Sequence, residues 1–155
     1  MKVEYINPFI EASQDVFKTL LDKEAKIGKI FLKASPFSVG DMVILIGIVG
    51  EIRGQVFLEL TFDTAEKIVS TMMDGITVTD IDEIGKSAIA EVGNMIMGNT
   101  CTIFSKKKIS IDITPPTILT GDKINISNKI ATIGIALIIE DYGTININIT
   151  AEEVL

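Results

Sequence analysis

The sequence predicts an α+β fold in which two repeated helix–strand–strand–strand units share one antiparallel sheet with long helices packed on it. Stretches with helical apolar spacing alternate along the chain with short segments in which apolar and polar residues alternate. The segment at 54–61 is similar to the segment at 143–150. A length of 155 residues and a hydrophobic fraction of 47% suit one domain with a large core.

The first half of the chain predicts a long helix, three strands and a short helix. We expect the long helix from about residue 8 to 23, because Asn7 can cap it and Pro8 suits its first position. The strands are expected at 27–33, 41–50 and 55–61. The short helix, at about 63–73, ends at Asp74-Gly75, a common C-cap signal.

The second half begins with the longest predicted helix, from about residue 80 to 105. Thr79 or Asp80 can cap this helix, with Glu83 three residues after Asp80. Three lysines at 106–108 suit its C-terminal end, where cations offset the helix dipole. The strands that follow are expected at 109–113, where Pro115-Pro116 stops the strand, and in a hairpin of 130–139 and 144–150.

Similar sequences in the two halves indicate an internal repeat. Ile46-Gly47-Ile48 in the first half resembles Ile133-Gly134-Ile135 in the second, and each precedes one of the similar segments described above. We therefore expect a single domain, 1–155, made of two units at about 7–75 and 80–150. Chance recurrence in an isoleucine-rich chain is the alternative.

Composition excludes several classes of enzyme and ligand. The chain has no histidine, which excludes nucleophiles activated by histidine and His-ligated zinc or haem. Its single cysteine, Cys101, excludes an intrachain disulfide and a cysteine cluster for a metal. Asp80 and Asp82 suit helix caps better than metal ligands, so we expect no metal site in this chain. The net charge of −7 would repel a phosphate backbone, so we expect no nucleic-acid partner.

The sequence favours a cytoplasmic protein that does not insert into a membrane. Glu4 and Asn7 interrupt the N-terminal stretch, where a signal peptide would be apolar. The longest apolar run, at 42–50, is far shorter than the roughly 20 residues that a membrane-spanning helix needs. An unpaired Cys101 also fits a reducing compartment.

The long helix at 80–105 carries a polar stripe. At about 100° per residue, its members fall on one narrow face. They are Glu83, Ser87, Glu91, Asn94 and Gly98. The residues expected to pack on the sheet from the other side are Ile81, Ala88, Val92, Met95, Ile96 and Ile103. A solvated helix face is the simple alternative to a binding site.

Three glycines in this helix, Gly85, Gly93 and Gly98, indicate tight packing or the close approach of another backbone. Each costs about 1 kcal/mol relative to alanine inside a helix. Gly98 belongs to the polar stripe, so we expect it to let a partner protein come near.

The chain resembles the CheC/CheX/FliY family of chemotaxis phosphatases, and its CheX branch most closely. The family motif reads here as Ser87, Glu91 and Asn94; Pro115-Pro116 follows earlier than the family proline, and no role is transferred to it. The opening segment, Ile6 to Ala12, and the segment Gly50 to Leu58 are also similar, so the resemblance covers nearly the whole chain.

The resemblance implies a phosphatase that dephosphorylates the aspartyl-phosphate of a CheY-type response regulator. We expect Asn94 to orient the attacking water, and the resemblance implies that Glu91 contacts the receiver's lysine. Ser87 is expected to bond the partner or Glu91, or to be a small surface residue. The Mg²⁺ belongs to the receiver, so this chain needs no cofactor. The resemblance also implies a homodimer through the sheet, with one active centre per subunit.

Other interpretations remain open. Glu11 and Gln14 in the first predicted helix have the motif's spacing, but Gln14 stands where the motif has asparagine, so we favour a structural role there. The main functional alternative is a non-catalytic adaptor that binds the response regulator, like a flagellar-switch component. A purely structural dimerisation domain is the third interpretation. The intact pair Glu91 and Asn94 favours the enzyme.

Overall fold

The structure is a computed structural model that describes residues 2–154, and it confirms the predicted α+β fold. The helices are α1 (Val3–Leu21), α2 (Phe62–Met72) and α3 (Glu83–Lys106). The strands are β1 (Ala25–Lys33), β2 (Phe37–Gly50), β3 (Ile52–Leu60), β4 (Ile111–Ile113), β5 (Thr117–Ile126), β6 (Thr132–Ile139) and β7 (Gly143–Glu153).

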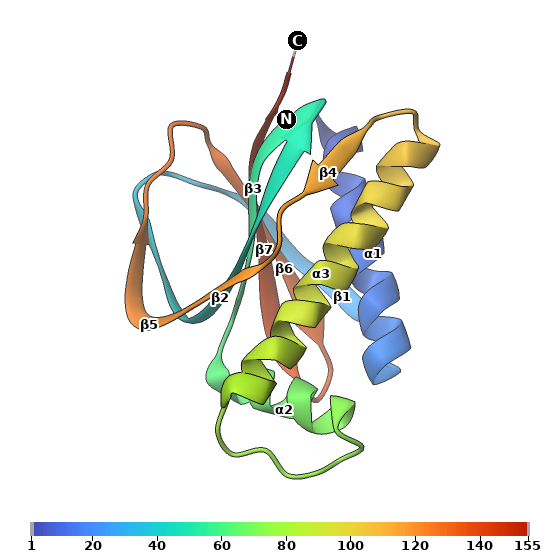
Figure 1. The fold of residues 1–155 in the computed structure, drawn as a ribbon. Coiled ribbons are helices and arrows are strands. Elements are labelled where there is room, and N and C mark those ends of the chain that lie inside the picture. The colour runs from blue at the N-terminus through green and yellow to red at the C-terminus, as the bar shows by residue number, and fades with distance from the viewer. Residues whose placement is uncertain (1, 155) are drawn as a thin grey trace.

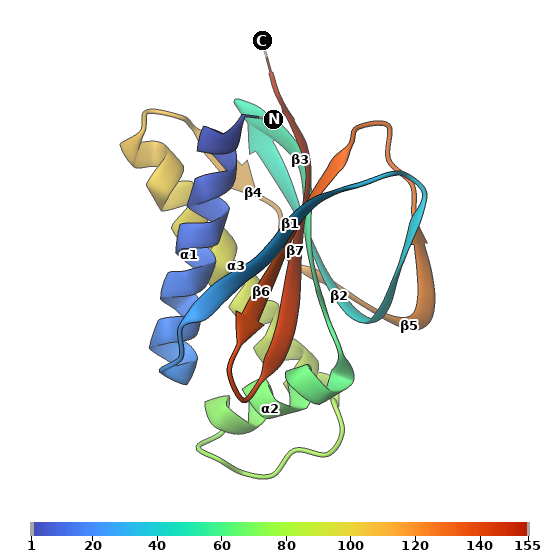
Figure 2. The same cartoon turned by 180° about the vertical axis from the view of Figure 1, so that it is seen from behind.

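All the strand pairs in the single sheet are antiparallel, in the order β1-β6-β7-β3-β2-β4. Strand β5 also pairs with β2, along residues 37–45, whereas β4 pairs with residues 48–50 of β2. Figures 1 and 2 show α1 and α3 side by side on one face of this sheet, with α2 across one end. The two long helices therefore form a layer over the sheet, as the sequence predicts.

The main core lies between this helical layer and the sheet. On β7 the isoleucines 145, 147 and 149 are buried in it, as their strict alternation predicts. Phe9 of α1 meets Phe104 of α3 edge-on, with ring centroids 5.7 Å apart, and this contact joins the two helices. Each such buried side chain contributes about 1.5–3 kcal/mol, so the core fixes how α3 lies on the sheet.

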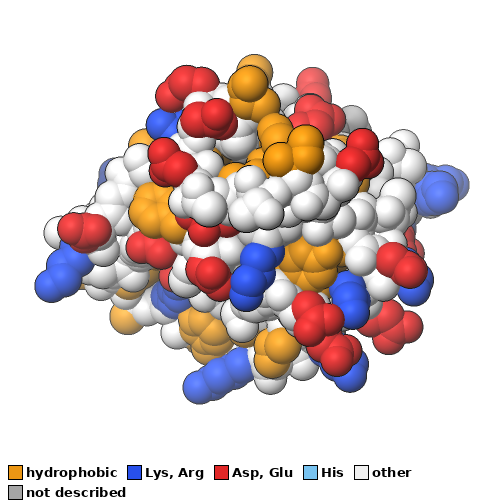
Figure 3. Space-filling model, turned by 90° about the horizontal axis from the view of Figure 1, so that it is seen from below, with side chains coloured by type: hydrophobic (Ala, Val, Ile, Leu, Met, Phe, Trp, Pro, Cys, Tyr) orange, Lys and Arg blue, Asp and Glu red, His pale blue; other side chains and the backbone are white. Residues whose placement is uncertain are grey.

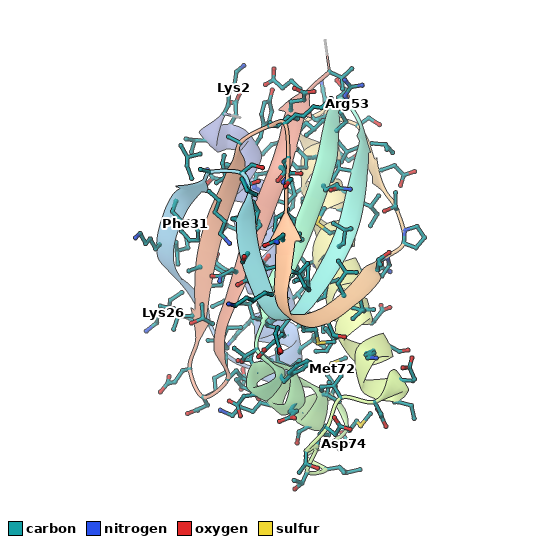
Figure 4. The ribbon with its side chains drawn as sticks, turned by 90° about the vertical axis from the view of Figure 1, so that its left-hand side faces the viewer. Lys2, Lys26, Phe31, Arg53, Met72 and Asp74 are labelled. Atoms are coloured by element: carbon teal, nitrogen blue, oxygen red, sulfur yellow. The ribbon has the colours of Figure 1, made fainter. Side chains whose placement is uncertain are left out.

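A second, smaller core occupies the opposite face of the sheet, the face toward the viewer in Figure 4. Phe57 stacks on Phe37 there, with centroids 5.7 Å apart, beside Val39 and Val43. Asn148 is fully buried beside Phe57, and its Nδ2 donates to the Phe57 carbonyl at 3.3 Å. Asn148 therefore belongs to the interior of the described chain and does not face solvent.

The strand order has an internal symmetry. Exchanging β1, β2 and β3 for β5, β6 and β7 turns the order β1-β6-β7-β3-β2-β5 into its own reverse. Two copies of one unit, packed about a pseudo-twofold axis, would produce this arrangement. We propose that the halves at about 7–75 and 80–150 are such copies.

The start of α1 was predicted wrongly. The helix begins at Val3 after Lys2, so Asn7 is not its cap and Pro8 lies inside it. Proline in a helix interior removes one backbone hydrogen bond. The packing of the first turns offsets this cost, because Ile6 is buried and the centroid of the Tyr5 ring lies 6.4 Å from that of the Phe104 ring.

The starts of α3 and the strand β5 also differ from prediction. Asp82, not Thr79 or Asp80, caps α3, because its Oδ1 accepts from the Gly85 N–H at 2.8 Å. The prediction had no strand at 117–126, whereas β5 begins there directly after Pro115-Pro116 and pairs with β2. Gly121-Asp122 within β5 resembles a turn in sequence. In the structure it lies where the register of the β2–β5 pairing shifts, between Val39 and Asp41 of β2.

Candidate functional site

Helix α3 is held on the sheet by its apolar side. Val92 and Ile96 are buried there as predicted, and Ile89, which the prediction left out, is buried with them. At Gly93 an added Cβ would lie 2.9 Å from Cγ2 of Ile44 on β2. Glycine at 93 therefore lets the helix backbone approach the sheet closely.

The opposite side of α3 presents the predicted stripe to solvent. Ser87, Glu91 and Asn94 are exposed, and Glu91 lies about 4.5 Å along the axis from Asn94 on the same face. Within residues 2–154, none of these three side chains makes a hydrogen bond or an ion pair. The structure therefore leaves all three available to a partner.

Gly98 lies in the same stripe but differs from Gly93. An added Cβ at Gly98 would meet no atom within 4 Å, so packing within the chain does not require glycine there. The space above Gly98 is open, and a partner's backbone can approach the helix at this point.

The N-terminal end of the stripe holds one ion pair and one apolar side chain. Glu83, the first predicted member, is paired with Lys86, with Oε1 and Nζ 3.3 Å apart. Ile84 is 65% exposed, three residues before Ser87 and seven before Glu91, which places it on the same face. Ile84 is apolar and so does not fit the polar pattern of the stripe, but its spacing from Ser87 and Glu91 is enough to place it on this face.

Helix α1 carries the related pair Glu11 and Gln14 in a different setting. Gln14 is part-buried, and its Nε2 donates to the Ala25 carbonyl of β1 at 2.9 Å. At the spacing of Gly98 stands Lys18, which pairs with Asp22 at 3.1 Å. The amide of Gln14 holds β1 against α1, which supports the structural role predicted for it.

The other chemical candidates are the thiol of Cys101 and the acidic side chains. Burial, followed by the negative charge of Asp112, raises the pKa of the Cys101 thiol and disfavours the nucleophilic thiolate. No three acidic or cysteine side chains gather as metal ligands anywhere in 2–154. Over the same residues, none of the helices is long and apolar enough to span a bilayer.

Comparison with known proteins identifies the family. The model of the family described as "Chemotaxis phosphatase CheX" matches residues 42–140, a range that contains the whole stripe on α3. The chain belongs to the CheX family. It is a chemotaxis phosphatase by family, which confirms the predicted resemblance and enzyme class.

Matches to individual relatives cover more of this chain than the CheX family model does. The CheY-P phosphatase CheX of Thermotoga maritima is 32% identical over 128 residues, which is 83% of each chain. A CheC-like protein from Shewanella sp. PV-4 superposes with a TM-score of 0.87 at 30% identity, covering 98% of this chain and 99% of that one. The CheX chain of a CheX–CheY–BeF3–Mg²⁺ complex from Borrelia burgdorferi gives a TM-score of 0.79 at 29% identity, covering 98% and 100%.

Proposed function

We propose that this chain dephosphorylates the aspartyl-phosphate of a CheY-type response regulator, and that Asn94 orients the attacking water. The observation that carries this proposal is the exposed, unbonded pair Glu91 and Asn94 on the outer face of α3. The relative from Thermotoga maritima bears the name CheY-P phosphatase, and the Borrelia burgdorferi relative forms a complex with CheY. Both names agree with the proposed substrate.

The proposed reaction is hydrolysis by in-line displacement. The water oxygen forms a bond to phosphorus while the bond from phosphorus to the receiver's aspartyl oxygen breaks, releasing inorganic phosphate and a free carboxylate. The receiver's own Mg²⁺ and lysine neutralise the charge on the phosphoryl group. The remaining requirement is a fixed water, and a carboxamide such as Asn94 both donates to and accepts from it.

Glu91 has a docking role in this proposal. Its carboxylate, about 4.5 Å along the helix from Asn94, accepts a charge-assisted hydrogen bond from the receiver's lysine. This bond fixes the orientation in which Asn94 enters the receiver's active site. Ser87 bonds the receiver backbone one turn earlier, and Gly98 lets the receiver come close one turn later.

The Mg²⁺ in this proposal is held by the receiver. The described part of this chain gathers no set of three acidic or cysteine side chains as metal ligands. The complex from Borrelia burgdorferi, which contains CheY, BeF3 and Mg²⁺ together, is consistent with a metal on the receiver side.

We also propose that the chain forms a homodimer through its sheet, at strand β1. This strand ends the sheet, and the apolar side chains of Ile30 and Leu32 on it are 54% and 74% exposed. An unpaired edge strand with exposed apolar residues favours pairing with another strand. Helix α3 contacts β2 and β4, away from β1, so this interface leaves Asn94 accessible. Leu32→Lys should produce monomers in sedimentation velocity, whereas an unchanged dimer would refute this interface.

The phosphatase proposal is tested by phosphate release from a phosphorylated, Mg²⁺-loaded CheY-type receiver with a substoichiometric amount of this protein. Release should accelerate over many turnovers, and Asn94→Ala should abolish the acceleration while leaving the far-UV spectrum and receiver binding unchanged. Binding without acceleration by the unmodified protein would favour the adaptor. Near-normal turnover by Asn94→Ala would refute the role of this residue.

A further inference from the structure

A hollow adjoins the stripe at the N-terminal end of α3. It has a volume of about 350 Å³ and lies between this end, the C-terminal end of α2 and the loop that joins them. Val69, Met73 and Val78 provide its apolar lining, and Ile84 stands at the side nearest the stripe. Figure 3 views the molecule from this end, where apolar side chains form patches among acidic and basic ones.

Ile84 is an apolar residue that packing within the chain leaves exposed. The apolar residues with which α3 packs on the sheet are buried or part-buried, whereas 65% of Ile84 is accessible. Ile84 belongs to the face that carries Ser87, Glu91 and Asn94, and the hollow continues that face beyond the start of the helix. The chain therefore leaves an apolar side chain beside an open hollow with a partly apolar lining, next to its proposed catalytic pair.

Ile84 is close enough to Asn94 along α3 to be covered by a protein docked on Asn94. Ten residues of α helix separate the two, which is about 15 Å along the axis. A standard interface covers about 800 Å² on each partner, equivalent to a disc with a radius of about 16 Å. A receiver centred on Asn94 therefore covers Ile84 and reaches the edge of the hollow.

We propose that Ile84 and this hollow form an apolar anchor for the phosphorylated receiver, which inserts an apolar side chain between α2 and α3. This inference rests on the proposed function. Asp80 and Asp82, which line the hollow together with Thr77 and Thr79, disfavour an acidic side chain in it. An apolar contact at one end of the stripe adds binding energy and fixes the direction in which the receiver lies along α3.

The anchor should act on binding and not on the chemical step. Replacing Ile84 with serine should raise KM about tenfold, equivalent to about 1.4 kcal/mol, at unchanged kcat. The volume-conserving change Ile84→Met should keep KM within about twofold of the original value. A matched control is Val3→Ser, which removes an apolar side chain of 74% exposure from the start of α1.

The same variants are measured in two assays, so that failure of the anchor can be separated from failure of the phosphatase proposal. One is steady-state phosphate release, and the other is binding to a receiver loaded with BeF3 and Mg²⁺, which needs no turnover. Weaker binding by Ile84→Ser alone supports the anchor even if the unmodified protein releases no phosphate. Equal affinity of Ile84→Ser and the unmodified protein, or an equal loss in Val3→Ser, overturns it.

Discussion

Replacing each of two glycines of α3 with alanine should have opposite effects on the stability of the protein, because Gly98 faces open space and Gly93 faces the sheet. Gly98→Ala should stabilise the protein, since an added Cβ meets no atom within 4 Å. Alanine in a helix interior is better than glycine by about 0.8–1.0 kcal/mol. For a chain of this length that gain should raise Tm by about 2–4 °C.

The matched variant is Gly93→Ala, in the same helix and with the same gain in helix propensity. Its Cβ would lie 2.9 Å from Cγ2 of Ile44, a side chain in the packed core. Overpacking of this kind costs about 1–3 kcal/mol, which cancels or exceeds the gain. Urea unfolding should therefore rank Gly98→Ala above the unmodified protein, and Gly93→Ala equal to it or below.

A larger side chain at Gly98 should separate stability from activity. Gly98→Lys places at this position the residue type that α1 has at Lys18. The fold should remain, but kcat/KM for the phosphorylated receiver should fall at least about tenfold, equivalent to about 1.4 kcal/mol, because the lysine obstructs close approach. Undiminished kcat/KM in Gly98→Lys, or destabilisation by Gly98→Ala, would refute the reasoning from open space.

Four further changes test other parts of the structure. Asp82→Ala should cost about 1 kcal/mol in urea unfolding because α3 loses its cap, and no loss would contradict the assigned helix start. Gln14→Ala should lower stability by about 1 kcal/mol with phosphatase activity unchanged; lost activity would point to a second centre. Glu91→Gln should weaken binding of the BeF3-loaded receiver, whereas lost turnover with full affinity would indicate a general base. Alkylation of Cys101 at pH 8 should be slower than that of a free cysteine, since its pKa is raised, and an equal rate would contradict the effect of burial.

Periodicity explains how much of the fold could be predicted from sequence. Helix α3 buries one side and exposes the other, so helical spacing predicted it. On β7 apolar and polar residues alternate, and alternation predicted this strand although both of its faces are largely buried. Strand β5 was missed because it bears polar residues along an exposed edge and contains Gly121-Asp122, so its pairing with β2 leaves no periodic signal. The start of α1 was missed because contacts of Tyr5 and Ile6, distant in sequence, outweigh the local signal of Pro8.

The site shows the same division between local pattern and three-dimensional packing. Helical phase alone placed Ser87, Glu91 and Asn94 on one face, and the structure exposes all three. Helical phase also placed Gly98 on this face, but it does not show how closely Gly93 approaches Ile44, because that distance depends on the sheet beneath the helix. The hollow beside Ile84 also depends on two elements and the loop between them.

The hydrogen bond from Gln14 to Ala25 bears on the number of receivers that each chain can bind. If the halves are copies of one unit, as proposed, the chain would be expected to offer two receiver sites, yet the carboxamide of Gln14 on α1 is bonded to β1. Each subunit should therefore accept a single receiver. In the proposed dimer, two receivers would bind on α3 helices remote from the β1 edge, and a titration should show two equal sites with no cooperativity between them.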